Sequence, residues 1–233
     1  MLKIKSISGL SLNSDGSKAV FTVTSIDPDG DSKWEYKYVN QLWLVSTDGN
    51  ASPKQLTAKE SSSQAAWSPD GNQIVFVRVA DGKPQLFLLS LNGGEAIQLT
   101  RFKYGAGNPK FSPDGKQIIF SAAVSTKDLL NDSMINPNLG IPLWPLEKPG
   151  ISKNEQLKNT AKPNPDGSIE EVRAYLDNNA ADKKAKVIDN LNFLEESTAS
   201  SDMSFNHFFK TGVEPGSAVT ALTHGFYNFS KGD

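Results

Sequence analysis

The segment Trp67-Ser68-Pro69-Asp70-Gly71 decides the fold, because it recurs as Phe111-Ser112-Pro113-Asp114-Gly115, 44 residues further along the chain. A weaker copy, Leu12-Asn13-Ser14-Asp15-Gly16, stands near the start. Pro-Asp-Gly between two apolar runs is typical of a turn, since proline presets its own φ, aspartate bonds to the backbone and glycine accepts a positive φ. Recurrence of the turn at a fixed period indicates a repeat architecture.

The same series of short segments follows each copy of the turn. A β-branched or aromatic run comes first, at 19–23, 74–77 and 118–120, and a second strand-like run follows at 41–45 and 85–89. The repeats then close with Gln55-Leu56-Thr57, Gln98-Leu99-Thr100 and Ala221-Leu222-Thr223. Each repeat has the length of four short antiparallel strands, which is the size of one propeller blade. We therefore expect an all-β protein whose blades bury their faces against one another.

The repeats predict a partial β-propeller of about three four-stranded antiparallel blades. We expect blade 1 at residues 1–57, blade 2 at 58–100, blade 3 at 101–223 and the start of a fourth at 224–233. The third blade is long because it carries a loop-and-helix insertion at about 125–204, which is rich in proline before a capping-box sequence at Ser168. Closed propellers have four to eight blades, so we expect a fragment of a larger propeller.

Composition excludes several classes of function. The formal charge is −2 and the pI about 5.8, so a nucleic-acid surface, which needs a basic excess, is not expected. There is no cysteine, which removes disulfides, thiolate zinc sites and a cysteine nucleophile. The apolar runs are too short for membrane insertion, and no signal peptide is recognisable within these residues.

The repeat resembles the propeller repeat shared by TolB, tricorn protease and the prolyl oligopeptidase family of serine peptidases. The resemblance rests on the aromatic-Ser-Pro-Asp-Gly turn, the Ile-Val-Phe strand at 74–76 and the Gln-Leu-Thr closure. The end of the third repeat, from Asn206-His207-Phe208-Phe209 to Leu222-Thr223, is similar to acylaminoacyl-peptidase-like and dipeptidyl-peptidase-like members. It departs from them by having Asn206 in place of a serine and Lys210-Thr211-Gly212 in place of an apolar strand.

The resemblance implies two alternative functions. In the first, the chain is the non-catalytic propeller part of a serine peptidase, and it gates the access of peptide substrates to a C-terminal α/β-hydrolase domain absent from these residues. The sequence leaves the compartment open, and the resemblance implies a periplasmic or secreted parent protein as one alternative, since enzymes of this family are often exported. In the second, the chain is a TolB-like propeller that binds another protein and performs no chemistry. Reading the gene beyond codon 233 separates the two, because the peptidase requires Gly-x-Ser-x-Gly further on.

We find no candidate catalytic, cofactor or metal residues in the sequence. The nearest string to the family nucleophile, Gly9-Leu10-Ser11, lacks the second glycine, and both histidines, His207 and His224, fit structural or surface roles. The carboxylates of 27–31 do not follow the EF-hand order, so we expect a solvated hairpin loop there. Trp144 is expected to pin the proline-rich loop. The chain by itself is therefore predicted to hydrolyse no peptide.

Overall fold

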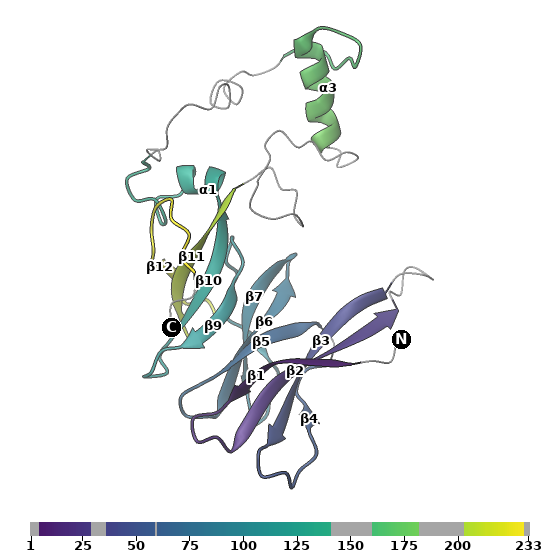
Figure 1. Ribbon diagram of the computed structural model, residues 1–233. Coiled ribbons are helices and arrows are strands. Elements are labelled where there is room, and N and C mark those ends of the chain that lie inside the picture. Colours follow the sequence, from purple (N-terminus) through teal and green to yellow (C-terminus); the bar gives the residue numbers. More distant parts are fainter. Residues whose placement is uncertain (1–4, 29–35, 59, 141–159, 182–202, 231–233) are drawn as a thin grey trace. The chain divides into compact units, whose positions relative to one another are not determined.

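The computed structural model describes residues 5–28, 36–58, 60–140, 160–181 and 203–230 (Figure 1). The chain divides into two compact units, Met1–Leu139 with Ser204–Asp233, and Gly140–Met203. The first unit holds three four-stranded antiparallel sheets, and the second holds the helix α3 (Ile169–Ala181). These observations confirm the predicted partial propeller with an insertion in its third blade. Trp144 and residues 29–31 lie outside the described residues.

Each sheet is a meander of strands in chain order. The first is β1 (Ser6–Leu12), β2 (Lys18–Pro28), β3 (Tyr36–Ser46) and β4 (Lys54–Gln55). The second is β5 (Ser62–Trp67), β6 (Gln73–Ala80), β7 (Lys83–Ser90) and β8 (Ile97–Gln98). The third is β9 (Gly107–Phe111), β10 (Gln117–Ser125), β11 (Ser204–Gly212) and β12 (Thr220–Ala221), with α1 (Thr126–Asn131) directly after β10.

The repeated turn joins the first and second strand of each blade by local hydrogen bonds. In the second blade, the Gly71 N–H donates to the Ser68 carbonyl over 2.9 Å, and the Asp70 carboxylate accepts from the Ser68 hydroxyl. The same bonds recur in the third blade at 112–115. Gly71 has a φ of 70°, in the left-handed region that glycine enters without strain. Sequence-local chemistry therefore fixes where each hairpin reverses.

Packing between blades forms the core. Val20 and Leu42 of the first blade pack against Ile74, Phe76 and Phe87 of the second, and each of these side chains is at least nine-tenths buried. Between the second and third blades, the rings of Phe102, Phe120 and Phe209 meet with centroids 4.7–5.7 Å apart. Burial of apolar area at about 25 cal/mol per Å² is the main stabilising term in such a core. A single blade cannot provide it, because both of its faces are apolar.

The first strands of neighbouring blades contact one another, as β1 does with β5 and β5 with β9. Each first strand carries an irregularity in its pairing, and the residues with positive φ there are Gly9, Gln64 and Asn108. Two hydrogen bonds cross between blades at these strands. The Trp67 indole N–H donates to the Ser11 carbonyl over 3.0 Å, and the Asn108 N–H donates to Oε1 of Gln64 over 2.6 Å.

Among the described residues, no helix is long and apolar enough to cross a membrane.

Candidate site at the base of the insertion

In each blade, a threonine that follows the last strand hydrogen-bonds to residues in the third strand. The Thr57 hydroxyl donates to Oε1 of Gln41 over 2.7 Å and accepts the Leu42 N–H over 2.9 Å. Thr100 makes the same pair of bonds, donating to Gln85 over 2.8 Å and accepting the Leu86 N–H over 2.9 Å. These bonds satisfy buried polar groups that would otherwise be costly.

The third blade repeats the threonine but replaces the glutamine. Thr223 accepts the Phe208 N–H over 2.9 Å, and its hydroxyl lies 3.1 Å from Nδ1 of His207. His207 therefore occupies the position that Gln41 and Gln85 hold in the other blades. Its side chain is completely buried in β11. Burial lowers the pKa of His207, and the charge of His224 lowers it further, while the Thr223 and Gly225 carbonyls act in the opposite direction.

The segment that leaves each blade is held differently in the second and third blades. Gln85 binds the Phe102 backbone with both ends of its amide, donating to the carbonyl over 2.9 Å and accepting the N–H over 2.9 Å. The equivalent residue after Thr223 is Gly225, and its N–H donates over 2.9 Å to the carbonyl of Ile135. Residues at the base of the insertion thus bind the segment that leaves the third blade.

This base is folded firmly onto the propeller unit. The side chain of Ser125 caps α1 by accepting the Asp128 N–H over 3.1 Å. Leu129 of α1 and Ile135 just after it are completely buried. The Asn136 side-chain amide donates to the Leu129 carbonyl over 3.1 Å, which closes the turn that follows the helix.

Asp132 connects the base to the segment between the second and third blades. Its Oδ2 atom accepts the Tyr104 hydroxyl over 2.6 Å and lies 2.7 Å from Nζ of Lys103. Its side chain is 13% exposed, and Lys103 also lies over the Tyr104 ring, 4.8 Å from its centroid. Burial alone would raise the pKa of Asp132, but the bonds from Lys103 and Tyr104 outweigh it and hold that pKa below its usual range. Burial and the Asp132 bond raise the pKa of Tyr104 to about 12.

The structure places the residues singled out in the sequence in two different blades. Ser11 lies in β1 of the first blade. Buried His207 and exposed His224 lie in the third, where they are close enough for the charge of His224 to act on His207. Among the described residues, no group of three or more His, Asp or Glu side chains could hold a metal ion. Lys210-Thr211-Gly212 does not interrupt the strand, because β11 continues through it with alternating burial. Asn206 binds Phe229, donating from its side chain to the Phe229 carbonyl over 2.9 Å.

Sequence reasoning missed the residues that build the base. Lys103, Tyr104 and Asp132 carry no motif, and the tyrosine and aspartate are 28 positions apart. The glutamine position had a visible signal, because Gln41 and Gln85 each precede a leucine and lie 16 and 15 residues before the closing threonine of their blade. That spacing would have placed His207 at the third such position.

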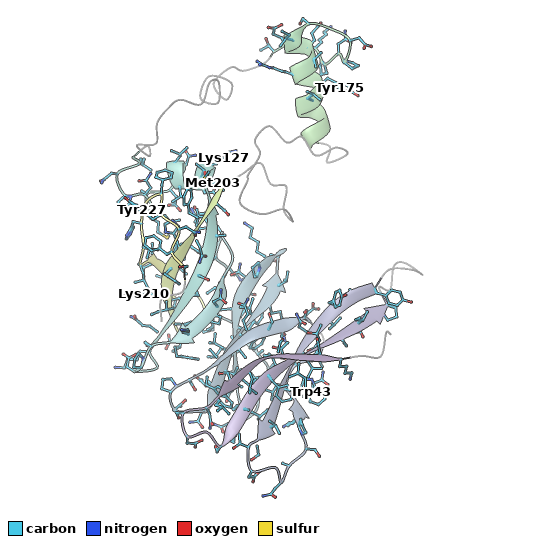
Figure 2. The ribbon with its side chains drawn as sticks, in the orientation of Figure 1. Trp43, Lys127, Tyr175, Met203, Lys210 and Tyr227 are labelled. Carbon is cyan, nitrogen blue, oxygen red and sulfur yellow. The ribbon has the colours of Figure 1, made fainter. Side chains whose placement is uncertain are left out.

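Figure 2 shows the side chains of the described residues on the ribbon, among them Lys210 in β11. Comparisons with known proteins find one matching family model and several solved structures of similar fold. Residues 13–111 match the family model described as the dipeptidyl peptidase IV N-terminal region. An acylaminoacyl peptidase in complex with Z-Gly-Gly-Phe-chloromethyl ketone is similar over 95% of this chain and 26% of its own, at 12% identity and a TM-score of 0.51. The apo AtxE2 isopeptidase is similar over 95% of this chain and 31% of its own, at 14% identity and a TM-score of 0.52.

TolB from Acinetobacter baumannii is similar over 51% of this chain and 27% of its own, at 18% identity and a TM-score of 0.40. No curated protein matches. At these identities the solved structures show the fold alone, and this chain spans only about a quarter to a third of their length. The family-model match confirms the resemblance to the N-terminal propeller portion of prolyl oligopeptidase-like peptidases.

Proposed function

We propose that this chain is the non-catalytic propeller part of a serine peptidase similar to acylaminoacyl and dipeptidyl peptidases, and that it gates peptide access to a separate α/β-hydrolase domain. The observation that carries the proposal is the match of residues 13–111 to the dipeptidyl peptidase IV N-terminal region. The base of the insertion supports it, because Asp132 and Ile135 bind the segments on both sides of the third blade. Loops on a rigid scaffold are where specific function is commonly placed.

One observation favours the alternative, a TolB-like propeller that binds another protein without chemistry. The β2–β3 hairpin is paired as far as Pro28 and Tyr36, and it exposes Tyr38 by 73% and Tyr36 by 46%. Tyrosine is enriched in protein interfaces, where its ring is buried and its hydroxyl finds a partner. An interaction module would use this hairpin whether or not a hydrolase domain exists.

The experiment uses the complete reading frame of the gene. The gating function requires Gly-x-Ser-x-Gly in that frame, and the encoded protein should cleave short chromogenic peptides faster than long ones. Asp132→Asn loosens the base of the insertion, so we expect it to raise the rate on long peptides relative to short ones. Asp81→Asn is the matched control, because Asp81 is 85% exposed and its carboxylate lies 3.9 Å from Arg101.

Three results would contradict the proposal. A complete frame that encodes propeller blades only would support the interaction module instead. An Asp132→Asn protein with the same length preference as Asp81→Asn would show that the base of the insertion has no part in gating. The 233-residue chain alone should show no hydrolysis, and activity removed by a serine-directed inhibitor would contradict its non-catalytic role.

A further inference from the structure

His207 stands where the other two blades have glutamine, and its surroundings do not suit a charge. It is completely buried, pairs across β10 with Ala122, and has its ring centroid 5.5 Å from that of Phe229. Among the described residues, His224 is the titratable group whose charge acts on it. Within the part of the chain that the structure describes, no carboxylate is placed to accept a proton from the ring, in contrast to the Asp132 cluster.

The repeat indicates which nitrogen of the ring carries the proton. In the first two blades the threonine hydroxyl donates to an acceptor, Oε1 of the glutamine, while its oxygen accepts a backbone N–H. Thr223 accepts the Phe208 N–H in the same way, so its hydroxyl proton is free to donate to Nδ1 of His207. The neutral ring then carries its proton on Nε2.

The His207 ring lies against the segment that leaves the third blade, with its centroid 5.5 Å from that of Phe229. Nε2 of the ring is buried and makes no hydrogen bond, although the carbonyls of Thr223 and Gly225 lie near enough to the ring to favour its protonated form. In the second blade, Nε2 of Gln85 donates fully to the corresponding Phe102 carbonyl over 2.9 Å. Histidine therefore holds the segment that leaves the blade less firmly than glutamine does at this position.

The same segment connects β11 to the base of the insertion. The Gly225 N–H donates to the Ile135 carbonyl, and the Phe229 N–H donates to the Asn206 carbonyl, each over 2.9 Å. The Phe226 ring meets Phe205 edge-on, with centroids 5.9 Å apart. We define residues 225–229 as the exit segment. Whatever displaces the exit segment from His207 also breaks its bond to the base.

We propose that His207 is a pH-sensitive positioning residue, which holds the exit segment against β11 and the base of the insertion when neutral and releases it when protonated. An imidazolium has an N–H on both nitrogens, so Nδ1 can no longer accept the Thr223 hydroxyl proton. A buried cation without a carboxylate partner is costly, and opening the exit segment returns the ring to water. The inference concerns the chain alone and does not depend on the proposed function.

The direction of the pH effect follows from linkage. Burial lowers the pKa of His207 in the closed state below the ordinary histidine value of 6.5, so the closed state binds fewer protons than the open one. Closure is therefore fully favoured above pH 6.5 and weakens as the pH falls below it. If the open ring has an ordinary pKa, the opening equilibrium increases by up to about 30-fold between pH 7.5 and pH 5.

The test is amide hydrogen exchange of the intact chain, with Gly225 and Phe229 as the reporting amides. After correction for the intrinsic exchange rate, their opening should increase about 10- to 30-fold from pH 7.5 to pH 5 in the unmodified protein. His207→Gln restores the glutamine of the other blades, so opening should become independent of pH. His224→Gln is the comparison variant, because it removes the one other histidine, which is exposed. The pH dependence should remain in it, with only its midpoint moved upward, since the charge of His224 no longer acts on His207.

Retention of the pH dependence in His207→Gln, or its absence in the unmodified protein, would overturn the proposal. If His207→Gln does not fold, the ring itself is followed by NMR in the unmodified chain. A neutral ring with its proton on Nε2 that titrates below 6.5 together with the exchange of Gly225 supports the proposal. A proton on Nδ1, or titration at an ordinary pKa with no change in Gly225, refutes it.

Discussion

Asp132→Asn should destabilise the chain by about 2–3 kcal/mol, because it changes a carboxylate that is 13% exposed and accepts three donors. Oδ2 accepts the Tyr104 hydroxyl over 2.6 Å and faces Nζ of Lys103 over 2.7 Å, while Oδ1 accepts the Met134 N–H over 2.9 Å. An amide has only one oxygen, so its NH2 must face at least one of these donors.

The magnitude is obtained by adding the bonds with a discount for solvent. The hydrogen bond from Tyr104 to a charged acceptor contributes about 1.5–2 kcal/mol. Lys103 is 57% exposed, so its ion pair contributes no more than about 1 kcal/mol. Asp81→Asn, in contrast, changes an aspartate that is 85% exposed and should alter the free energy of unfolding by less than about 0.5 kcal/mol.

Urea denaturation of the two variants and the unmodified chain at pH 7 measures the effect. The pKa of Asp132 is held below the ordinary aspartate value of 3.8, so the stabilising contribution of the carboxylate is present above that pH and is lost as the pH falls further. The difference between the unmodified chain and Asp132→Asn should therefore shrink below about pH 4. An Asp132→Asn protein as stable as Asp81→Asn at pH 7 would refute the reasoning.

Three further predictions concern single residues. The pKa of Tyr104 is raised to about 12 by burial, so ultraviolet titration should find its hydroxyl protonated at pH 11. The stabilising effect of the hydroxyl is present below pH 10 and is lost as the pH rises through 12. A difference spectrum between the unmodified chain and Tyr104→Phe that shows ionisation near pH 10 would disagree. Thr100→Val leaves the buried Leu86 N–H without its acceptor, so denaturation should show a loss of about 2 kcal/mol. Gly16→Ala and Gly115→Ala should each lower the free energy of unfolding by about 1 kcal/mol, since both glycines have φ near 70°. At neither position does a backbone atom lie within 4 Å of the added carbon, so the two costs should be alike. A large difference between the two variants in denaturation would contradict this.

Much of the fold was predictable because its signals are local. Each reversal at Asp70 or Asp114 is made by hydrogen bonds within six residues, so the same letters produce the same turn wherever they occur. The alternation of apolar positions in β11 likewise places Phe205, His207 and Phe209 on one buried face. The departure at Lys210-Thr211-Gly212 did not matter, since the strand is held by its pairing with β10 along its whole length.

The candidate site was not predictable to the same degree. The bond between Tyr104 and Asp132 spans 28 residues, and it forms only because the segment after the second blade and the base of the insertion meet on the third blade. The sequence shows that residue 207 is a histidine, but its role depends on a distant group, the Ile135 carbonyl. That carbonyl accepts the Gly225 N–H, whereas the corresponding Phe102 N–H of the second blade is accepted by Oε1 of Gln85.

The sequence by itself determined the repeat, the turns and the all-β class, because hairpin chemistry and strand periodicity act over a few neighbouring residues. Only the tertiary structure decided that Val20 and Leu42 pack on Phe76, that Asp132 is buried between two donors, and that His207 is enclosed without a full partner. These outcomes depend on which distant surfaces are brought together and on the water excluded from them. A charge or an unpaired nitrogen is costly only when it is buried, and a short segment of sequence does not show whether it will be buried.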